Sequence, residues 1–152
     1  MDFGLVKASW AEEATDTRLT IEGMAGGTPA YIAPEVALGN REIDARVDLY
    51  ALGCVGYWLV TGHTVFEAQT AMQMSLQHAH TRPVPPSQRT EMNVPEPLER
   101  LILRCLEKDP DKRPASAVEL VEDLAACPLE RPWTPDRARH WWQMHLPPNS
   151  AG

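Results

Sequence analysis

The chain has 152 residues, of which 43% are hydrophobic and 23% are charged. These fractions are typical of one globular domain and exclude a chain that is disordered throughout. The 21 acidic and 14 basic residues give a net charge of -7, which argues against general binding to nucleic acid or to an anionic membrane. Three widely spaced cysteines and the lack of a signal peptide predict reduced thiols and a cytoplasmic protein.

The predicted elements begin with a long irregular segment, from about residue 5 to residue 33. The apolar stretch from Val47 to Val60 then predicts a helix, with Asp44 as its N-cap and Gly62 as its stop signal. At 14 residues this stretch is too short to span a bilayer, so no transmembrane segment is predicted. Because no face of the helix is consistently polar, we expect other elements to surround it at the centre of the domain.

Three further helices are predicted in the domain. The first runs from Thr70 to His80, and the second, from Glu96 to Lys108, has one apolar face at helical spacing. Ser116 and Glu119 form a capping box that begins the third helix, which stops near Pro128. No run of five or more residues alternates strictly enough to predict a strand, so the predicted fold class is mainly α.

A tail rich in tryptophan follows the last of these helices. Thr134-Pro135 predicts the start of one more helix. One face of this helix carries four residues at i, i+3, i+4 and i+7 spacing: Ala138, Trp141, Trp142 and His145. An aromatic face of this kind usually covers a core, which favours packing on the domain, and the alternatives are docking to a partner or to a membrane surface.

Five short motifs occur in an order that is characteristic of one enzyme family. They are Asp2-Phe3-Gly4, Gly27-Thr28-Pro29, Ala33-Pro34-Glu35, the run from Asp48 to Gly53, and Lys112-Arg113-Pro114. D-F-G alone is a weak signal, but five ordered motifs are specific. Residues 2 to about 127 resemble the C-terminal lobe of bacterial eukaryotic-like serine/threonine protein kinases. We therefore expect a partial kinase domain at residues 1–127 and a tail at residues 128–152.

The resemblance implies a C-lobe fragment without the N-lobe and the catalytic loop. In complete kinases the Gly-rich loop, the strand lysine and the H-R-D loop all precede D-F-G, so no catalytic residue is expected to be retained here. The complete enzyme uses ATP and Mg²⁺, and Asp2 resembles its metal ligand. A lone carboxylate binds Mg²⁺ weakly, so no cofactor is expected to bind this chain tightly.

Three residues resemble the substrate-positioning segment of serine/threonine kinases: Thr28, Pro29 and Tyr31. In the family, the threonine hydrogen-bonds the catalytic aspartate, and the residues after it form a floor under the substrate. The plain alternative for Thr28 is a turn residue before proline. The implied partners are proteins that present a serine or threonine.

The segment between Gly4 and Gly26 resembles a regulatory activation loop. Its candidate phosphorylation sites are Thr20, Thr17 and Thr15. We favour Thr20, because it lies eight residues before Thr28, as autophosphorylated positions do in bacterial relatives. The alternative is an ordinary polar loop residue.

Three charged residues are implied to be structural. Glu35 and Arg113 lie 78 positions apart, and the resemblance implies that they form a buried ion pair, although each alone would pass for a surface charge. Asp48, just inside an apolar helix, must find hydrogen-bond donors or take up a proton. In kinases its donors are amides of the catalytic loop.

Two functions from different classes are compatible with the sequence. The first is part of an ATP-dependent serine/threonine kinase, inactive without its upstream half. The second is a non-catalytic binding or decoy module that uses the substrate-docking surface and the tail. The resemblance favours the first, and it predicts exposed apolar surface on the central helix, where the missing segments would pack.

Overall fold

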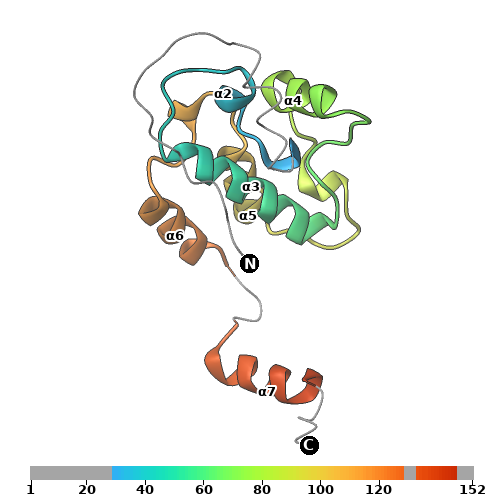
Figure 1. Cartoon of the computed structure of the whole chain (residues 1–152). Helices are drawn as coiled ribbons and strands as arrows, with labels where there is room; N and C mark the ends of the chain where they lie inside the picture. Colours follow the sequence, from blue (N-terminus) through green and yellow to red (C-terminus); the bar gives the residue numbers. More distant parts are fainter. Residues whose placement is uncertain (1–28, 129–132, 147–152) are drawn as a thin grey trace, which may run out of the picture.

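The computed structural model describes residues 29–128 and 133–146, and every regular element in these ranges is helical (Figure 1). The predicted mainly α fold class is therefore confirmed. In chain order the elements are η2 (Pro29–Tyr31), α2 (Pro34–Ala37), α3 (Arg46–Thr61), α4 (Ala71–His80), η3 (Pro86–Gln88), α5 (Glu96–Cys105), η4 (Pro110–Lys112), α6 (Ala117–Ala126) and α7 (Pro135–His145). None of the described helices has the length and apolar character needed to cross a membrane.

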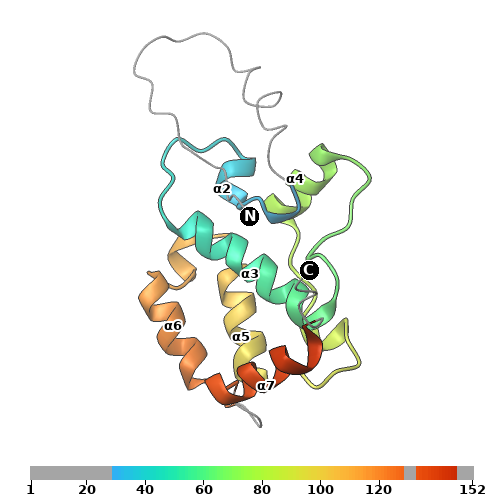
Figure 2. The same cartoon turned by 60° about the horizontal axis from the view of Figure 1, so that its bottom comes forward.

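Helix α3 lies at the centre of the domain, with α2 and α4 on one side and α5 and α6 on the other (Figures 1 and 2). The core side of α3 carries four buried residues: Leu49, Tyr50, Cys54 and Tyr57. At Gly53 the helix approaches α5 so closely that a Cβ atom placed there would lie 2.6 Å from Cys105 Cβ. The absence of a side chain at Gly53 therefore permits this close approach of α3 to α5.

The expectation that other elements surround α3 is wrong for one of its faces. Leu52 is 50% exposed and Leu59 is 69% exposed, and Val55 between them is also exposed. No described element covers this face. The apolar side chains on this face of α3 are therefore exposed to water.

The ends of α3 follow the sequence signals closely. Ala45 takes the N-cap position, one residue after the predicted Asp44, whose carboxylate instead accepts a hydrogen bond from the Arg46 backbone N–H at 2.8 Å. Gly62 ends the helix at φ 73°, the left-handed conformation that glycine adopts without strain.

Helix α6 begins at the predicted cap, and α4 begins one residue after the predicted start, because Thr70 is its cap. The Thr70 hydroxyl accepts from the Gln73 backbone N–H, and the Ser116 hydroxyl accepts from that of Glu119. The Glu119 carboxylate accepts from the Ala115 backbone N–H at 2.7 Å, one residue before the partner that a capping box would use.

Helix α5 begins at Glu96 as predicted but ends at Cys105, three residues before the predicted end. Its end differs because Lys108 leaves the helix and turns its side chain inward, where the ammonium donates to the His78 carbonyl at 2.7 Å. The tertiary contact therefore replaces the last helical turn that the apolar pattern suggested.

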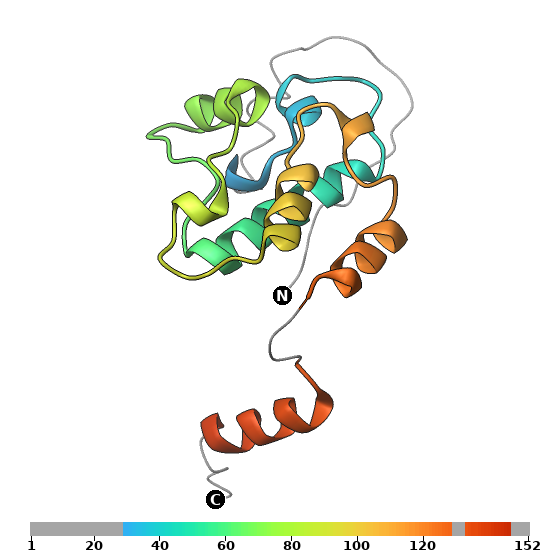
Figure 3. The ribbon, with the colours of Figure 1, turned by 180° about the vertical axis from the view of Figure 1, so that it is seen from behind.

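Helix α7 is present as predicted, and the Thr134 hydroxyl caps its first turn. None of its residues is buried, and it lies apart from the other helices (Figures 1 and 3). Its rings pack on one another: Trp141 stacks on His145 at 4.2 Å between centroids and meets Trp142 edge-on at 4.8 Å.

All three cysteines are free thiols, and all are buried. Burial raises the pKa of Cys54 to about 12 and the pKa of Cys105 to about 11. Cys127 lies just beyond the end of α6. The thiols thus serve as small apolar core groups.

Candidate functional site

The most tightly organised polar contact in the described residues joins Glu35, in the first turn of α2, to Arg113, which follows η4. Arg113 Nη1 donates to Glu35 Oε1 and Nη2 donates to Glu35 Oε2, both at 2.7 Å. The arginine is 2% exposed and the glutamate 5%. This parallel two-bond geometry is the strongest that a guanidinium and a carboxylate form.

The remaining Arg113 contacts reach two further parts of the chain, α3 and the loop after α5. Its Nε donates to the Glu107 carbonyl at 2.9 Å, and Nη1 also donates to the Arg46 carbonyl at 3.0 Å. The guanidinium carbon lies 4.9 Å from the centre of the Tyr50 ring. One side chain therefore ties α2 to the start of α3 and to the loop after α5, and desolvation of its charge is offset by several acceptors.

Pro29 and Tyr31 lie in η2, directly before the segment that Glu35 anchors. Both are half-buried, while Ala30 between them is buried. Tyr31 packs against the core cluster that contains Tyr50, and η2 contacts both α3 and α4. The described part of the predicted substrate-positioning segment is thus held against the two helices by packing and is anchored by the ion pair.

Several predicted site residues lie outside the described residues. They are Asp2, Thr15, Thr17, Thr20 and Thr28. Of the predicted residues within the description, Glu35 and Arg113 are brought together, Pro29 and Tyr31 lie nearby in sequence, and Asp48 lies elsewhere on α3.

Asp48 is exposed, so the expectation that its carboxylate is enclosed and needs partners inside the fold is wrong in this structure. Its carboxylate has no hydrogen-bond or ion-pair partner among the described residues. Water solvates the charge instead, because the face of α3 that carries Asp48 is open.

A second polar cluster, which the sequence did not reveal, lies under η2. The Tyr50 hydroxyl and His78 Nδ1 are 2.9 Å apart, and Lys108 Nζ lies 3.3 Å from the same hydroxyl. Because an ammonium can only donate, the hydroxyl accepts from Lys108 and donates to Nδ1, which places the His78 proton on Nε2. His78 is fully buried, and Nε2 has no hydrogen-bond partner among the described residues.

The three side chains of this cluster titrate far from their ordinary ranges. Burial, together with the Lys108 charge, lowers the pKa of His78 to about 4. Burial lowers the pKa of Lys108 to about 8 and raises the pKa of Tyr50. His78 is therefore neutral at pH 7, and its uncharged ring packs in the core of this region. In the sequence, its only signal was the isolated pair His78-x-His80, a pattern too common to indicate a site.

Acid is expected to destabilise the domain through His78. Below pH 6.5 the unfolded chain binds a proton at this ring and the folded chain does not, so stability falls as the pH drops from 6.5 to about 4. We expect His78→Gln to remove about 2 kcal/mol of this pH-dependent loss. Urea unfolding of both proteins between pH 7 and pH 4 measures the difference. Parallel pH profiles would contradict the assignment.

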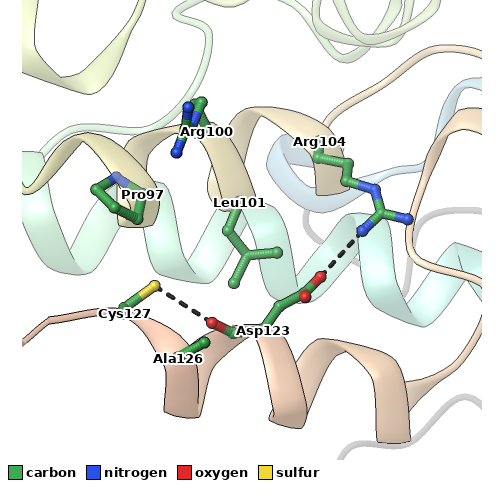
Figure 4. Close-up of a pocket in the computed structure, with 7 residues that line it drawn as sticks. All are labelled: Pro97, Arg100, Leu101, Arg104, Asp123, Ala126 and Cys127. Carbon is green, nitrogen blue, oxygen red and sulfur yellow. Dashed lines mark hydrogen bonds and ion pairs between the residues drawn. The ribbon is translucent and has the colours of Figure 1, made fainter.

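Within residues 29–128 and 133–146, no group of three or more His, Cys, Asp or Glu side chains is placed to hold a metal. One cavity of about 290 Å³ has only apolar lining residues. Another, of about 270 Å³, lies between α5 and α6, where Arg104 already pairs with Asp123 (Figure 4).

Comparison with known proteins agrees with the class that the motifs and the ion pair indicate. The model of the protein kinase domain family matches residues 1–125, so the chain belongs to the protein kinase family. It is 40% identical over 134 residues to serine/threonine-protein kinase pkn3 of Myxococcus xanthus, covering 86% of this chain and 24% of that protein. It is 38% identical over 124 residues to serine/threonine-protein kinase PknB of Mycobacterium leprae, covering 82% and 19%.

A third relative, serine/threonine-protein kinase PknB of Mycobacterium tuberculosis, is 36% identical over 126 residues. That match covers 82% of this chain and 19% of the relative. The chain thus spans about a quarter or less of the length of these curated relatives.

Proposed function

We propose that this chain is the C-terminal lobe of a serine/threonine protein kinase. With its upstream half, the enzyme transfers the γ-phosphoryl group of ATP to serine or threonine hydroxyls of protein substrates. The observation that carries the proposal is the buried pair between Glu35 and Arg113, because it anchors the Ala33-Pro34-Glu35 end of the activation segment to the last helices of the domain. The family match over residues 1–125 supports it.

The site roles belong to the same proposal. Asp2 is the Mg²⁺ ligand of the complete enzyme, and Thr28, Pro29 and Tyr31 position the substrate. Thr20 is the favoured regulatory phosphosite, ahead of Thr17 and Thr15. The kinase portion ends at about residue 127, and residues 128–152 form a separate tail.

The chain alone is expected to transfer no phosphate, because it contains no H-R-D motif and no Gly-rich loop that could cover a nucleotide. Purified chain incubated with ATP, Mg²⁺ and a generic basic protein substrate should give no labelled product above a no-enzyme control. Labelled substrate from this preparation would contradict the prediction.

A chimera tests the positive half of the proposal. The part of the Myxococcus xanthus relative that precedes its D-F-G motif is fused in front of Asp2, and protein phosphorylation is expected to appear. Asp2→Asn in the chimera should reduce phosphorylation to background while the circular dichroism spectrum stays unchanged. A folded but inactive chimera would argue for the alternative, a non-catalytic binding module.

A further inference from the structure

An apolar groove runs along the open face of the domain. It has a volume of about 290 Å³, and its walls come from α3, α5 and α6. Leu52, Val55 and Leu59 form the α3 wall, Leu98 lies on the α5 wall and Leu124 on the α6 wall. No charged side chain of the described residues lines the groove. An open apolar surface of this kind is unfavourable in water and favours an apolar occupant.

The α3 wall has a charge at one end. Asp48, Leu52, Val55 and Leu59 follow each other at i, i+4, i+7 and i+11 spacing, so they lie on one face of the helix. Asp48 thus marks the end of the wall opposite to Leu59. Its carboxylate is exposed and has no ion-pair partner among the described residues.

Helix α7 presents a complementary surface. Its aromatic face, made of Ala138, Trp141, Trp142 and His145, has no ring partner outside the tail among the described residues. Trp141 is 40% exposed and Trp142 is 53% exposed.

The chain leaves α6 next to the start of α5, and from this point α7 can turn back along the groove. Ala126 and Cys127 lie beside Pro97, at the start of α5 (Figure 4). Leu98, the next residue of α5, lines the groove together with Leu59 and Val60 at the end of α3. Helix α6 therefore ends beside the first turn of α5, which lines the groove through Leu98.

The lengths also match. The connection from Cys127 to Thr134 has eight residues, within the range of about 2–8 that joins neighbouring helices in bundles. Helix α7 has 11 residues and is about 16 Å long, and the eleven-residue separation of Asp48 and Leu59 also spans about 16 Å. A helix that turns back at this connection can cover the whole α3 wall.

We propose that α7 closes over the groove of its own chain, antiparallel to α6. In this register Ala138 lies opposite Leu59, the two tryptophans lie opposite Val55, and His145 lies about one turn from Asp48. The structure shows the open arrangement, with both apolar surfaces exposed. The inference goes beyond the proposed function, because it concerns the tail and the groove of the chain without its upstream half.

Disulfide trapping tests the closed arrangement directly. The double variant Leu59→Cys with Ala138→Cys is oxidised with glutathione disulfide at low micromolar concentration. The native thiols are buried, so they react slowly. The matched control pairs Ala138→Cys with Met72→Cys, an exposed position on α4. We expect an intramolecular disulfide in the first variant, in about tenfold higher yield than in the control, because closure brings position 138 next to position 59, whereas the tether alone acts on both pairs.

Each outcome of the trapping experiment decides the proposal. An intramolecular disulfide that peptide mass spectrometry maps to the two introduced cysteines of the Leu59→Cys, Ala138→Cys variant supports it. Disulfide-linked dimers would overturn it in favour of a second copy in the groove. Equal yields in this variant and the control, or no disulfide in either, would also overturn it.

Tryptophan fluorescence gives a second readout that needs no new thiols. In a Trp58→Phe background, Leu59→Glu places a charge in the groove at an exposed position and is expected to shift the emission to longer wavelength, as the tail tryptophans enter water. Leu76→Glu, on the exposed face of α4, is the control and should leave the emission unchanged. Identical spectra for both variants would contradict the closed arrangement. This result would not depend on any kinase assay.

Discussion

Replacing Arg113 with alanine is expected to lower the free energy of unfolding by about 3–5 kcal/mol. The change leaves the Glu35 carboxylate buried without its partner and also removes donors from the Glu107 and Arg46 carbonyls. Because small domains are stable by only about 5–15 kcal/mol, the variant should be partly or wholly unfolded at 37 °C. Urea unfolding followed by circular dichroism measures the loss.

Arg100 provides the matched control for this prediction. Its ion pair with Glu96 spans one turn of α5 at 3.3 Å, and its side chain is 69% exposed. Arg100→Ala should cost no more than about 0.5 kcal/mol, since water screens the pair and solvates the remaining charge. Equal losses for the two arginine variants would show that the buried pair is not a principal anchor of the domain.

Two glycines of α3 are expected to respond to alanine in opposite directions. A Cβ atom at Gly53 would lie 2.6 Å from Cys105 Cβ, which is too close unless α3 and α5 move apart. Gly53→Ala should therefore lower stability by about 1–3 kcal/mol. At Gly56 the nearest atom, Ile102 Cγ1, is 3.4 Å away, so Gly56→Ala should raise stability by up to about 1 kcal/mol through helix propensity.

Thermal unfolding of the two glycine variants tests this contrast, because each contains the same single methyl addition on the same helix. A melting temperature that falls for Gly53→Ala and rises for Gly56→Ala is the expected result. The close contact between α3 and α5 would be disproved if both variants were equally stable.

The sequence predicts the helices well where a local signal marks their ends. Thr70, Ser116 and Thr134 each accept a hydrogen bond from a backbone N–H three residues later, and each stands at the helix start that the sequence predicts. The end of α5 was misjudged, because the periodic apolar pattern cannot show that Lys108 is drawn to the His78 carbonyl, 30 residues earlier in the chain.

The sequence likewise predicts one part of the candidate site and misses another. Glu35 and Arg113 were paired through the family resemblance, since nothing in the spacing of two charges 78 positions apart indicates contact. The cluster of Tyr50, His78 and Lys108 was missed because its members come from three separate segments and belong to no motif. The exposure of α3 was also misjudged, because an all-round apolar helix indicates burial only when the elements that cover it are in place.

Burial makes the cysteine thiols unreactive. Only the thiolate attacks electrophiles and oxidants, and pKa values of about 12 for Cys54 and about 11 for Cys105 leave almost none of it at neutral pH. Both sulfurs are also shielded from reagents by the contacts of α3 and α5. Alkylation of these thiols therefore requires the helices to separate. The alkylation rate of the native protein thus reports how often its core opens.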